Sequence, residues 1–229
     1  MPEASDAMTL IRVWDLPTRL FHWLLAAAVI GSVITANIGG NAMVWHFRLG
    51  LLVLGLLLFR VVWGLIGGRW SRFASFLYAP PTLLRYLRGQ SRAEERLDVG
   101  HSPLGALSVF ALLTLLSLQV GTGLVADDEI ANVGPLNRFV SGQTAQLATG
   151  WHQEFGQWIV IGLVLLHVAA IVYYAVARKQ NLVRPMLGGD KALPPSTPAS
   201  DDGLGQRLLA LAIAGASVSV VLWVWRLGA

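Results

Sequence analysis

The sequence has no cysteine and few charged residues. Charged side chains make up 13% of the 229 residues and hydrophobic side chains 55%, a balance that does not suit a water-soluble domain of this size. The lack of cysteine excludes disulfides, cysteine-ligated zinc, iron-sulfur clusters and covalent haem attachment through a C-x-x-C-H motif. Any cofactor must therefore be held by histidine, methionine or carboxylate side chains, and the expected class is a membrane protein.

The net charge of +4 does not indicate a nucleic-acid-binding surface. The basic residues lie between apolar segments and are not interleaved with aromatic residues on one surface, as nucleic-acid recognition would require. We therefore expect membrane lipid, and no nucleic acid, around this chain.

Long apolar runs predict a bundle of membrane-spanning helices. A helix that crosses a bilayer needs about 20 mostly apolar residues. Five segments meet this requirement: Leu20 to Ile38, Met43 to Gly67, Leu104 to Val125, Trp151 to Val176, and Leu204 to Trp225. The first has features of a secretory signal because Arg19 precedes it, but His22 within the run favours a retained helix.

Basic residues orient the bundle, because cytoplasmic loops carry an excess of lysine and arginine. They precede the first segment and fill the connections from the second to the third and from the fourth to the fifth. These residues are Arg12, Arg19, Arg69, Arg72, Arg85, Arg88, Arg92, Arg96, Arg178, Lys179, Arg184 and Lys191. The other two connections are uncharged or mainly acidic, so the N-terminus is predicted to be cytoplasmic.

The predicted fold class is all-α, with four parts. Residues 1–19 form a cytoplasmic segment, 20–187 a four-helix core, 188–203 a cytoplasmic linker, and 204–229 an additional C-terminal transmembrane helix. The linker is rich in glycine, proline, serine and aspartate, which suits a flexible tether. Two cytoplasmic pieces are expected to be ordered: Pro17 suits the first turn of a helix, and residues 71–90 mix arginine with apolar residues as interfacial helices do.

Four of the five histidines pair by depth in the membrane. His152 and His167 are 15 residues apart, which is a rise of roughly 22 Å on nearly the same helix face. The topology places His46 at the depth of His152, and His22 at the depth of His167. We call His46 and His152 the outer pair, and His22 and His167 the inner pair.

Each pair suits bis-histidine ligation of haem iron, which needs one imidazole on either side of the metal. Gly50, Gly156 and Ala26 follow their histidines by one turn and leave room for a flat macrocycle, although helix packing also uses small residues. A closed zinc site would need its ligands around one ion. A small transporter normally adds acidic residues at helix centres. The sequence therefore favours two b-type haems, with a haem-free scaffold or small transporter as the alternative.

Four motifs stand out along the chain: "VWDLPTRLFHWLLAA", "LLLFRVVWGLIGGRWSRFASF", "GHSPLGALSVFALL" and "LHVAAIVYYAVARKQNLVRPM". Together they resemble the bacterial cytochrome b561 family, in the branch of the cytochrome b subunits of nickel-iron hydrogenases, and the resemblance covers roughly residues 12–188. It implies a four-helix di-haem core in the bacterial inner membrane, with His22, His46, His152 and His167 as iron ligands in the same pairs. The fifth helix departs from the minimal family pattern.

The resemblance and the paired histidines predict a cytochrome that transfers electrons between the quinone pool and a periplasmic redox partner, either a c-type cytochrome or a hydrogenase-like protein. The sequence leaves open whether the chain is an enzyme in itself, such as a superoxide or quinol oxidoreductase, or an electron-transfer subunit of a quinone-linked oxidoreductase. Asp127, Asp128 and Glu129 offer an acidic surface that can steer a basic cytochrome c, or simply form a solvated turn.

Four further residues are candidates for supporting roles. Arg60 falls near the depth of the inner pair, and Arg19 and Arg48 lie within about one turn of His22 and His46. Each suits pairing with a haem propionate, and snorkelling to the headgroups is the alternative for Arg60. His101 is a candidate for a quinone hydrogen bond or for proton transfer, or else for an interfacial helix cap.

Overall fold

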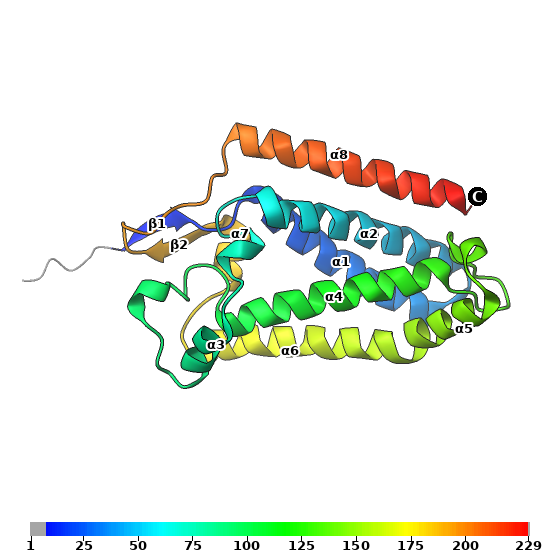
Figure 1. Ribbon diagram of the computed structural model, residues 1–229, viewed down its shortest axis with the longest axis horizontal. Coiled ribbons are helices and arrows are strands. Elements are labelled where there is room, and N and C mark those ends of the chain that lie inside the picture. Colours follow the sequence, from blue (N-terminus) through cyan, green and yellow to red (C-terminus); the bar gives the residue numbers. More distant parts are fainter. Residues whose placement is uncertain (1–7, 229) are drawn as a thin grey trace, which may run out of the picture. The chain divides into compact units, whose positions relative to one another are not determined.

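The structure, a computed structural model, describes residues 8–228 (Figure 1). Five helical stretches in it are long and apolar enough to cross a membrane. Their main helices are α1 (Leu16–Ile38), α2 (Met43–Ile66), α4 (Pro103–Val125), α6 (Gln157–Val176) and α8 (Leu204–Leu227). They correspond to the five apolar segments of the sequence, so the predicted membrane helical bundle with an additional C-terminal helix is confirmed.

Shorter elements precede the first of these helices or lie between them. They are β1 (Thr9–Arg12), η1 (Gly40–Ala42), η2 (Phe73–Ser75), α3 (Pro80–Leu87), η3 (Ala93–Glu95), η4 (Asn137–Phe139), α5 (Gly142–Gly150), η5 (Trp151–Gly156), α7 (Val183–Gly188) and β2 (Asp190–Leu193). The two strands form an antiparallel pair, which the all-α prediction did not include.

Helix α1 begins four residues before the apolar run that predicts it. The Asp15 carboxylate accepts a hydrogen bond of 2.8 Å from the N–H of Thr18, as a helix N-cap does. Pro17 lies in the first turn, where its fixed backbone angle suits a helix and its missing N–H costs nothing. The cap residue, and not the start of the hydrophobic run, therefore sets where α1 begins.

The helix that carries His152 and His167 begins nine residues earlier than predicted, at Gly142. Helix α5, the π-helical turn η5 and α6 follow one another without a break over 35 residues. That length corresponds to roughly 52 Å, whereas the hydrocarbon core of a bilayer is about 30 Å thick. The Thr149 hydroxyl bonds both the N–H and the C=O of Asp127, which follows the end of α4. Helix α5 therefore extends beyond the end of α4.

The chain divides into two compact units. The first comprises the described residues up to 20 together with 61–109 and 168–211, and the second comprises 21–60, 110–167 and 212–228. Each of the five long helices contributes residues to both units. All four paired histidines belong to the second unit, and His101 belongs to the first.

The second unit has a core built by four helices. Its buried members come from α1 (Ala28), α2 (Val53 and Leu57), α4 (Leu116) and α6 (Val160). Helix α8 approaches α2 closely at Gly55, where an added Cβ would lie 3.2 Å from the Val221 side chain. Within this unit, α1, α2, α4 and α6 therefore share one apolar core, and α8 packs against α2.

A buried carboxylate organises the first unit. Asp15 is fully buried, and its oxygens accept hydrogen bonds from Trp63 Nε1 at 3.1 Å and from the Ser71 hydroxyl at 2.5 Å, besides the Thr18 cap. Gly68 permits this arrangement, because a Cβ there would lie 2.3 Å from the Asp15 carboxylate. Asp15 thus joins the start of α1 to the end of α2 and the loop that follows.

The segment 188–203, predicted to be a flexible tether, is instead held by specific bonds to distant residues. Strand β2 lies beside β1 (Figure 1), and the two strands pair with Arg12 opposite Asp190. Ser200 donates its hydroxyl proton to the Val13 carbonyl at 2.8 Å, and Trp70 Nε1 donates to the Pro198 carbonyl at 2.8 Å. Composition indicates flexibility only where a segment lacks partners, and here the partners come from the N-terminal segment and from the loop after α2.

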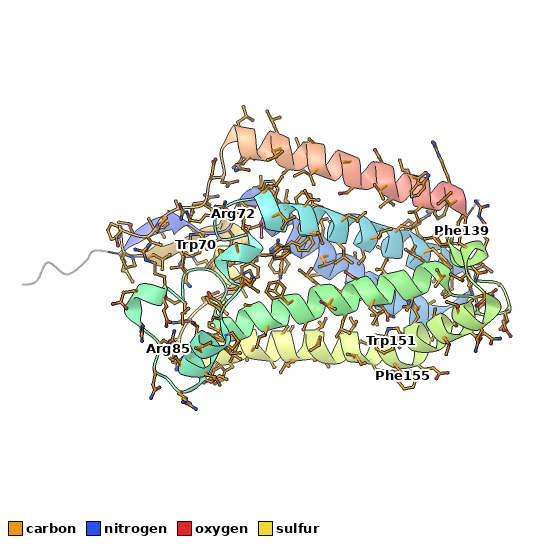
Figure 2. The ribbon with its side chains drawn as sticks, viewed as in Figure 1. Trp70, Arg72, Arg85, Phe139, Trp151 and Phe155 are labelled. Atoms are coloured by element: carbon orange, nitrogen blue, oxygen red, sulfur yellow. The ribbon has the colours of Figure 1, made fainter. Side chains whose placement is uncertain are left out.

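The predicted interfacial segment, residues 71–90, contains the 3₁₀ turn η2 and one short α-helix, α3. Its Arg85, which Figure 2 labels, pairs with Glu95. Leu84 and Leu87 expose more than half of their surface. Exposed leucines beside arginines are typical of helices that lie at a membrane surface. The location of α3 at the membrane surface stays a prediction.

We expect Asp15→Ala to lower the free energy of unfolding by on the order of 3 kcal/mol, because it leaves the buried Thr18 N–H and the Ser71 hydroxyl without their acceptor. The measurement is the unfolding temperature of the detergent-solubilised protein. The control is Asp201→Ala, because the exposed Asp201 carboxylate accepts, within the described part of the chain, only from the nearby N–H of Gly203. Equal shifts in both variants would contradict the role given to Asp15.

The Asp202 carboxylate makes the stability of the first unit depend on pH. Burial by itself raises the pKa of Asp202, but the N–H of Leu16 and the guanidinium groups of Arg207 and Arg12 outweigh burial and hold this pKa below its ordinary value. The stabilisation is therefore present above about pH 3.9, the ordinary value for aspartate, and is lost as pH falls through the lowered pKa.

Accordingly, we expect Asp202→Asn to unfold at a lower temperature than the unsubstituted protein at pH 7. The two unfolding temperatures should converge as the pH falls below about 4, because a protonated aspartate resembles asparagine. A difference that is constant from pH 7 to pH 3 would mean that the Asp202 charge does not stabilise the unit.

Candidate functional site

The structure brings the four predicted histidines together as two pairs. In the outer pair, the imidazoles of His46 on α2 and His152 on η5 have ring centroids 5.9 Å apart and planes at 83°. In the inner pair, the imidazoles of His22 on α1 and His167 on α6 have centroids 6.4 Å apart and planes at 53°. No group of three or more histidine or acidic side chains suited to a metal occurs among residues 8–228, so the histidines meet two at a time.

These separations suit one metal ion between each two imidazoles. A histidine nitrogen lies about 2 Å from a metal that it ligates. Two imidazoles on opposite sides of one ion therefore have ring centroids on the order of 6 Å apart. The centroid distances of both pairs match this value.

Backbone carbonyls fix the tautomers of the outer pair. His46 Nδ1 lies 2.9 Å from the Ser32 carbonyl oxygen, and His152 Nδ1 lies 2.8 Å from the Gln119 carbonyl oxygen. Because a carbonyl only accepts hydrogen bonds, each Nδ1 must carry the proton. Each neutral ring then keeps its lone pair on Nε2, as a ligand for haem iron requires, and such carbonyl partners are typical of metal-bound histidines.

A cavity of about 490 Å³ adjoins the outer pair. This volume is in the range of small-molecule and cofactor sites. Its lining includes both histidines and glycines 50 and 123, with Gln119, Gln153 and Gln157 among the polar side chains. At Gly50, the predicted small residue, an added Cβ would meet no atom within 4 Å, so this glycine keeps one wall open.

Gly156 has a different role from the predicted one, and Gly123 has a role that the sequence did not predict. Gly156 faces the Gln119 amide and the Trp151 indole, because a Cβ at Gly156 would lie 2.0 Å from Gln119 Oε1 and 2.7 Å from Trp151 Nε1. Gly123, which spacing did not single out, lies against the His152 ring, where a Cβ would be 2.7 Å from Cε1. Gly123 thus makes room for the ring of His152.

Arg60 and Phe21 lie in the same unit as the inner pair. Arg60 is only 3% exposed, and its guanidinium lies 5.9 Å from the centre of the Phe21 ring, next in sequence to His22. His22 Nδ1 is buried and has no hydrogen-bond partner among the described residues. The role of Arg60 toward a haem propionate stays a prediction, and its buried position suits an anionic partner.

The other two predicted arginines make contacts elsewhere. Arg48 lies over the Trp45 ring at 5.0 Å and lines a groove with Leu51, Val221 and Trp225, and it is not among the residues that line the outer cavity. Arg19 donates to the Leu187 carbonyl at 2.5 Å and lies 4.0 Å from the Asp202 carboxylate. Pairing of Arg19 or Arg48 with propionates stays a prediction that these contacts do not support.

His101 lies in the first unit between two aromatic rings. Its ring centroid is 4.7 Å from that of Trp14 and 4.5 Å from that of Phe76, and Tyr78 donates its hydroxyl proton to the His101 carbonyl at 2.7 Å. This packing places the imidazole beside buried aromatic surface. Its role toward a quinone stays a prediction.

In the acidic loop, the Asp128 carboxylate accepts hydrogen bonds from other residues of the same loop. Hydrogen bonds from the Asn132 side chain, and from the N–H groups of Asn132, Ala131 and Ile130, hold the pKa of Asp128 far below its usual range. Glu129 accepts a hydrogen bond from Gln146 of α5 at 2.7 Å. The loop is therefore an ordered turn whose Asp128 charge persists at all physiological pH values.

Comparison with known proteins identifies the family. Residues 13–189 match the family described as prokaryotic cytochrome b561. The chain is 26% identical to the probable Ni/Fe-hydrogenase B-type cytochrome subunit of Rhodobacter capsulatus, a match that covers 82% of this chain and 84% of that protein. It is 22% identical to the probable Ni/Fe-hydrogenase 1 B-type cytochrome subunit of Escherichia coli strain K12, over 82% of this chain and 94% of that protein.

No solved structure matches the chain. The family match includes α1, α2, α4 and α6 and therefore all four paired histidines. The chain belongs to the prokaryotic cytochrome b561 family, and it is a membrane b-type cytochrome that binds haem b and takes part in electron transfer.

Proposed function

We propose that the chain holds two b haems, one at each histidine pair, and passes electrons between the quinone pool and a redox partner at the periplasmic face. The observation that carries this proposal is the presence of two imidazole pairs, each with a centroid distance that suits one iron. His152 and His167 lie 15 residues apart on one continuous helix, a rise of roughly 22 Å, so the two sites would lie at different depths.

The residues of the chain hold and insulate the haems. A bound haem supplies a site that takes up and releases one electron. The Ser32 and Gln119 carbonyls keep the outer imidazoles in the tautomer that ligates, and the apolar core around Leu116 and Val160 keeps water away. Arg60 is proposed as a propionate partner at the inner pair.

The partners are proposed from the relatives and from charge. The similar proteins are named as Ni/Fe-hydrogenase cytochrome subunits, which supports a hydrogenase-like partner for this chain. A c-type cytochrome is the alternative, supported by the acidic loop. The basic connections support a cytoplasmic N-terminus in a bacterial inner membrane. His101 is proposed at the quinone end, although its aromatic packing would have to open.

Membership of a b-type cytochrome family favours this proposal over the haem-free scaffold or transporter. A reduced-minus-oxidised absorbance spectrum of the purified protein, with a haem-to-protein ratio, tests it. Two low-spin b haems per chain are expected. A ratio of one after expression with adequate haem supply would contradict the di-haem proposal and leave the family assignment intact.

Single histidine variants should each remove one haem. We expect His46→Ala or His152→Ala to lose the outer haem, and His22→Ala or His167→Ala to lose the inner one, because each site then lacks one of the two imidazoles that would hold a haem. The measurement is the haem-to-protein ratio and the redox titration of each variant. His101→Ala is the control and should keep both haems. Retention of two haems after both members of a pair are replaced would disprove that pairing.

Gly123→Ala should disturb the outer haem alone. The added Cβ would lie 2.7 Å from His152 Cε1, which is too close, so the ring must move. The matched control is Gly121→Ala on the same helix, where an added Cβ would meet nothing within 4 Å. We expect loss or an altered spectrum of the outer haem in the first variant and no change in the second. Identical spectra and midpoint potentials in both variants would show that His152 does not occupy this position.

A further inference from the structure

Gln119 contacts His152 twice. Its backbone carbonyl accepts from His152 Nδ1 at 2.8 Å, and its side-chain Nε2 donates to the His152 carbonyl at 2.8 Å. Gln119 lies on α4, which carries no histidine. We propose that Gln119 is the positioning residue for His152 and thereby sets the reduction potential of the outer haem, an inference that rests on the proposed outer haem site.

The direction of the Gln119 amide follows from its partner. The His152 carbonyl only accepts hydrogen bonds, so Nε2 must face it and Oε1 must point the other way. Oε1 is buried without a hydrogen-bond partner among residues 8–228, and so is the indole donor Trp151 Nε1. Both atoms lie against the same side of Gly156, at 2.0 and 2.7 Å from the position of an added Cβ.

The residues that lie against the Gln119 side-chain amide belong to one π-helical turn, η5. Trp151, His152 and Gly156 all belong to η5 (Figure 2 labels Trp151). π-helical turns are rare and frequently occur at functional sites. One hydrogen bond between Trp151 Nε1 and Gln119 Oε1, direct or through a single water, would satisfy the two remaining buried groups. Gln119 would then be fixed from both ends of its amide.

The two outer ligands are therefore held differently. His46 has one hydrogen bond from its ring to the Ser32 carbonyl. His152 has its ring bonded to the backbone of Gln119 and its own backbone bonded to the Gln119 side chain. A hydrogen-bond acceptor at Nδ1 makes the opposite nitrogen a better donor to the metal, which favours the oxidised form and lowers the reduction potential. The Gln119 side chain keeps that acceptor in place.

The test is Gln119→Leu, which keeps the size of the side chain and removes both amide groups. Redox titration followed by difference spectra should give one midpoint potential higher than in the unsubstituted protein and one unchanged. The raised potential should be the one that is absent from His46→Ala. The electron paramagnetic resonance signal of the same haem should shift, because it reports the orientation of the axial imidazoles.

Gly156→Ala is the second variant, because its Cβ would displace the Gln119 amide while leaving Gln119 itself in the chain. It should raise the same potential. Ser117→Ala is the control, since the exposed Ser117 hydroxyl of Gln119's helix bonds, among the residues described, only the Leu113 carbonyl. The proposal is overturned if Gln119→Leu and Gly156→Ala leave the potential and resonance signal of the outer haem unchanged. Absence of an outer haem from the unsubstituted protein would instead overturn the proposed function.

Discussion

A backbone carbonyl can accept a hydrogen bond but cannot donate one, and this constraint determines what the outer histidines can bind. In water, either imidazole nitrogen can carry the proton. Beside the carbonyls of Ser32 and Gln119, only Nδ1 can, and Nε2 is left for a ligand. The other features of the site support this arrangement: Gly123 gives the His152 ring its place, and Gly50 leaves the cavity open.

The first unit also depends on hydrogen bonds to a buried oxygen acceptor, here the carboxylate of Asp15. A buried carboxylate is costly unless its oxygens are well hydrogen-bonded. Asp15 receives hydrogen bonds from a backbone N–H, an indole and a hydroxyl, and these donors belong to three different parts of the chain. The cost of burial is offset only in the native arrangement, so Asp15 contributes to the specificity of the fold as well as to its stability.

The sequence predicts correctly those features that depend only on distance along the chain. Bilayer thickness and apolar runs located the five spans, and helical rise matched the histidines by depth. The prediction fails where the structure depends on the rotation of a helix about its axis or on contacts with residues far away in the sequence. Gln119 and Gly123 were missed because spacing does not fix which side of α4 faces His152. Helix α5 was missed because its sequence, GQTAQLATG, lacks an apolar run. The linker was assigned as flexible because composition does not reveal its partners.

The pairing of β1 with β2 has a consequence for biogenesis. Arg12 and its partner Asp190 are separated by 178 residues, and Asp202 joins them through a second ion pair. At roughly 5–20 residues per second, the ribosome needs about 10–40 s to make the second strand after the first. Four membrane helices emerge in that interval. Strand β1 therefore stays without its partner strand, β2, until nearly the whole chain has been synthesised.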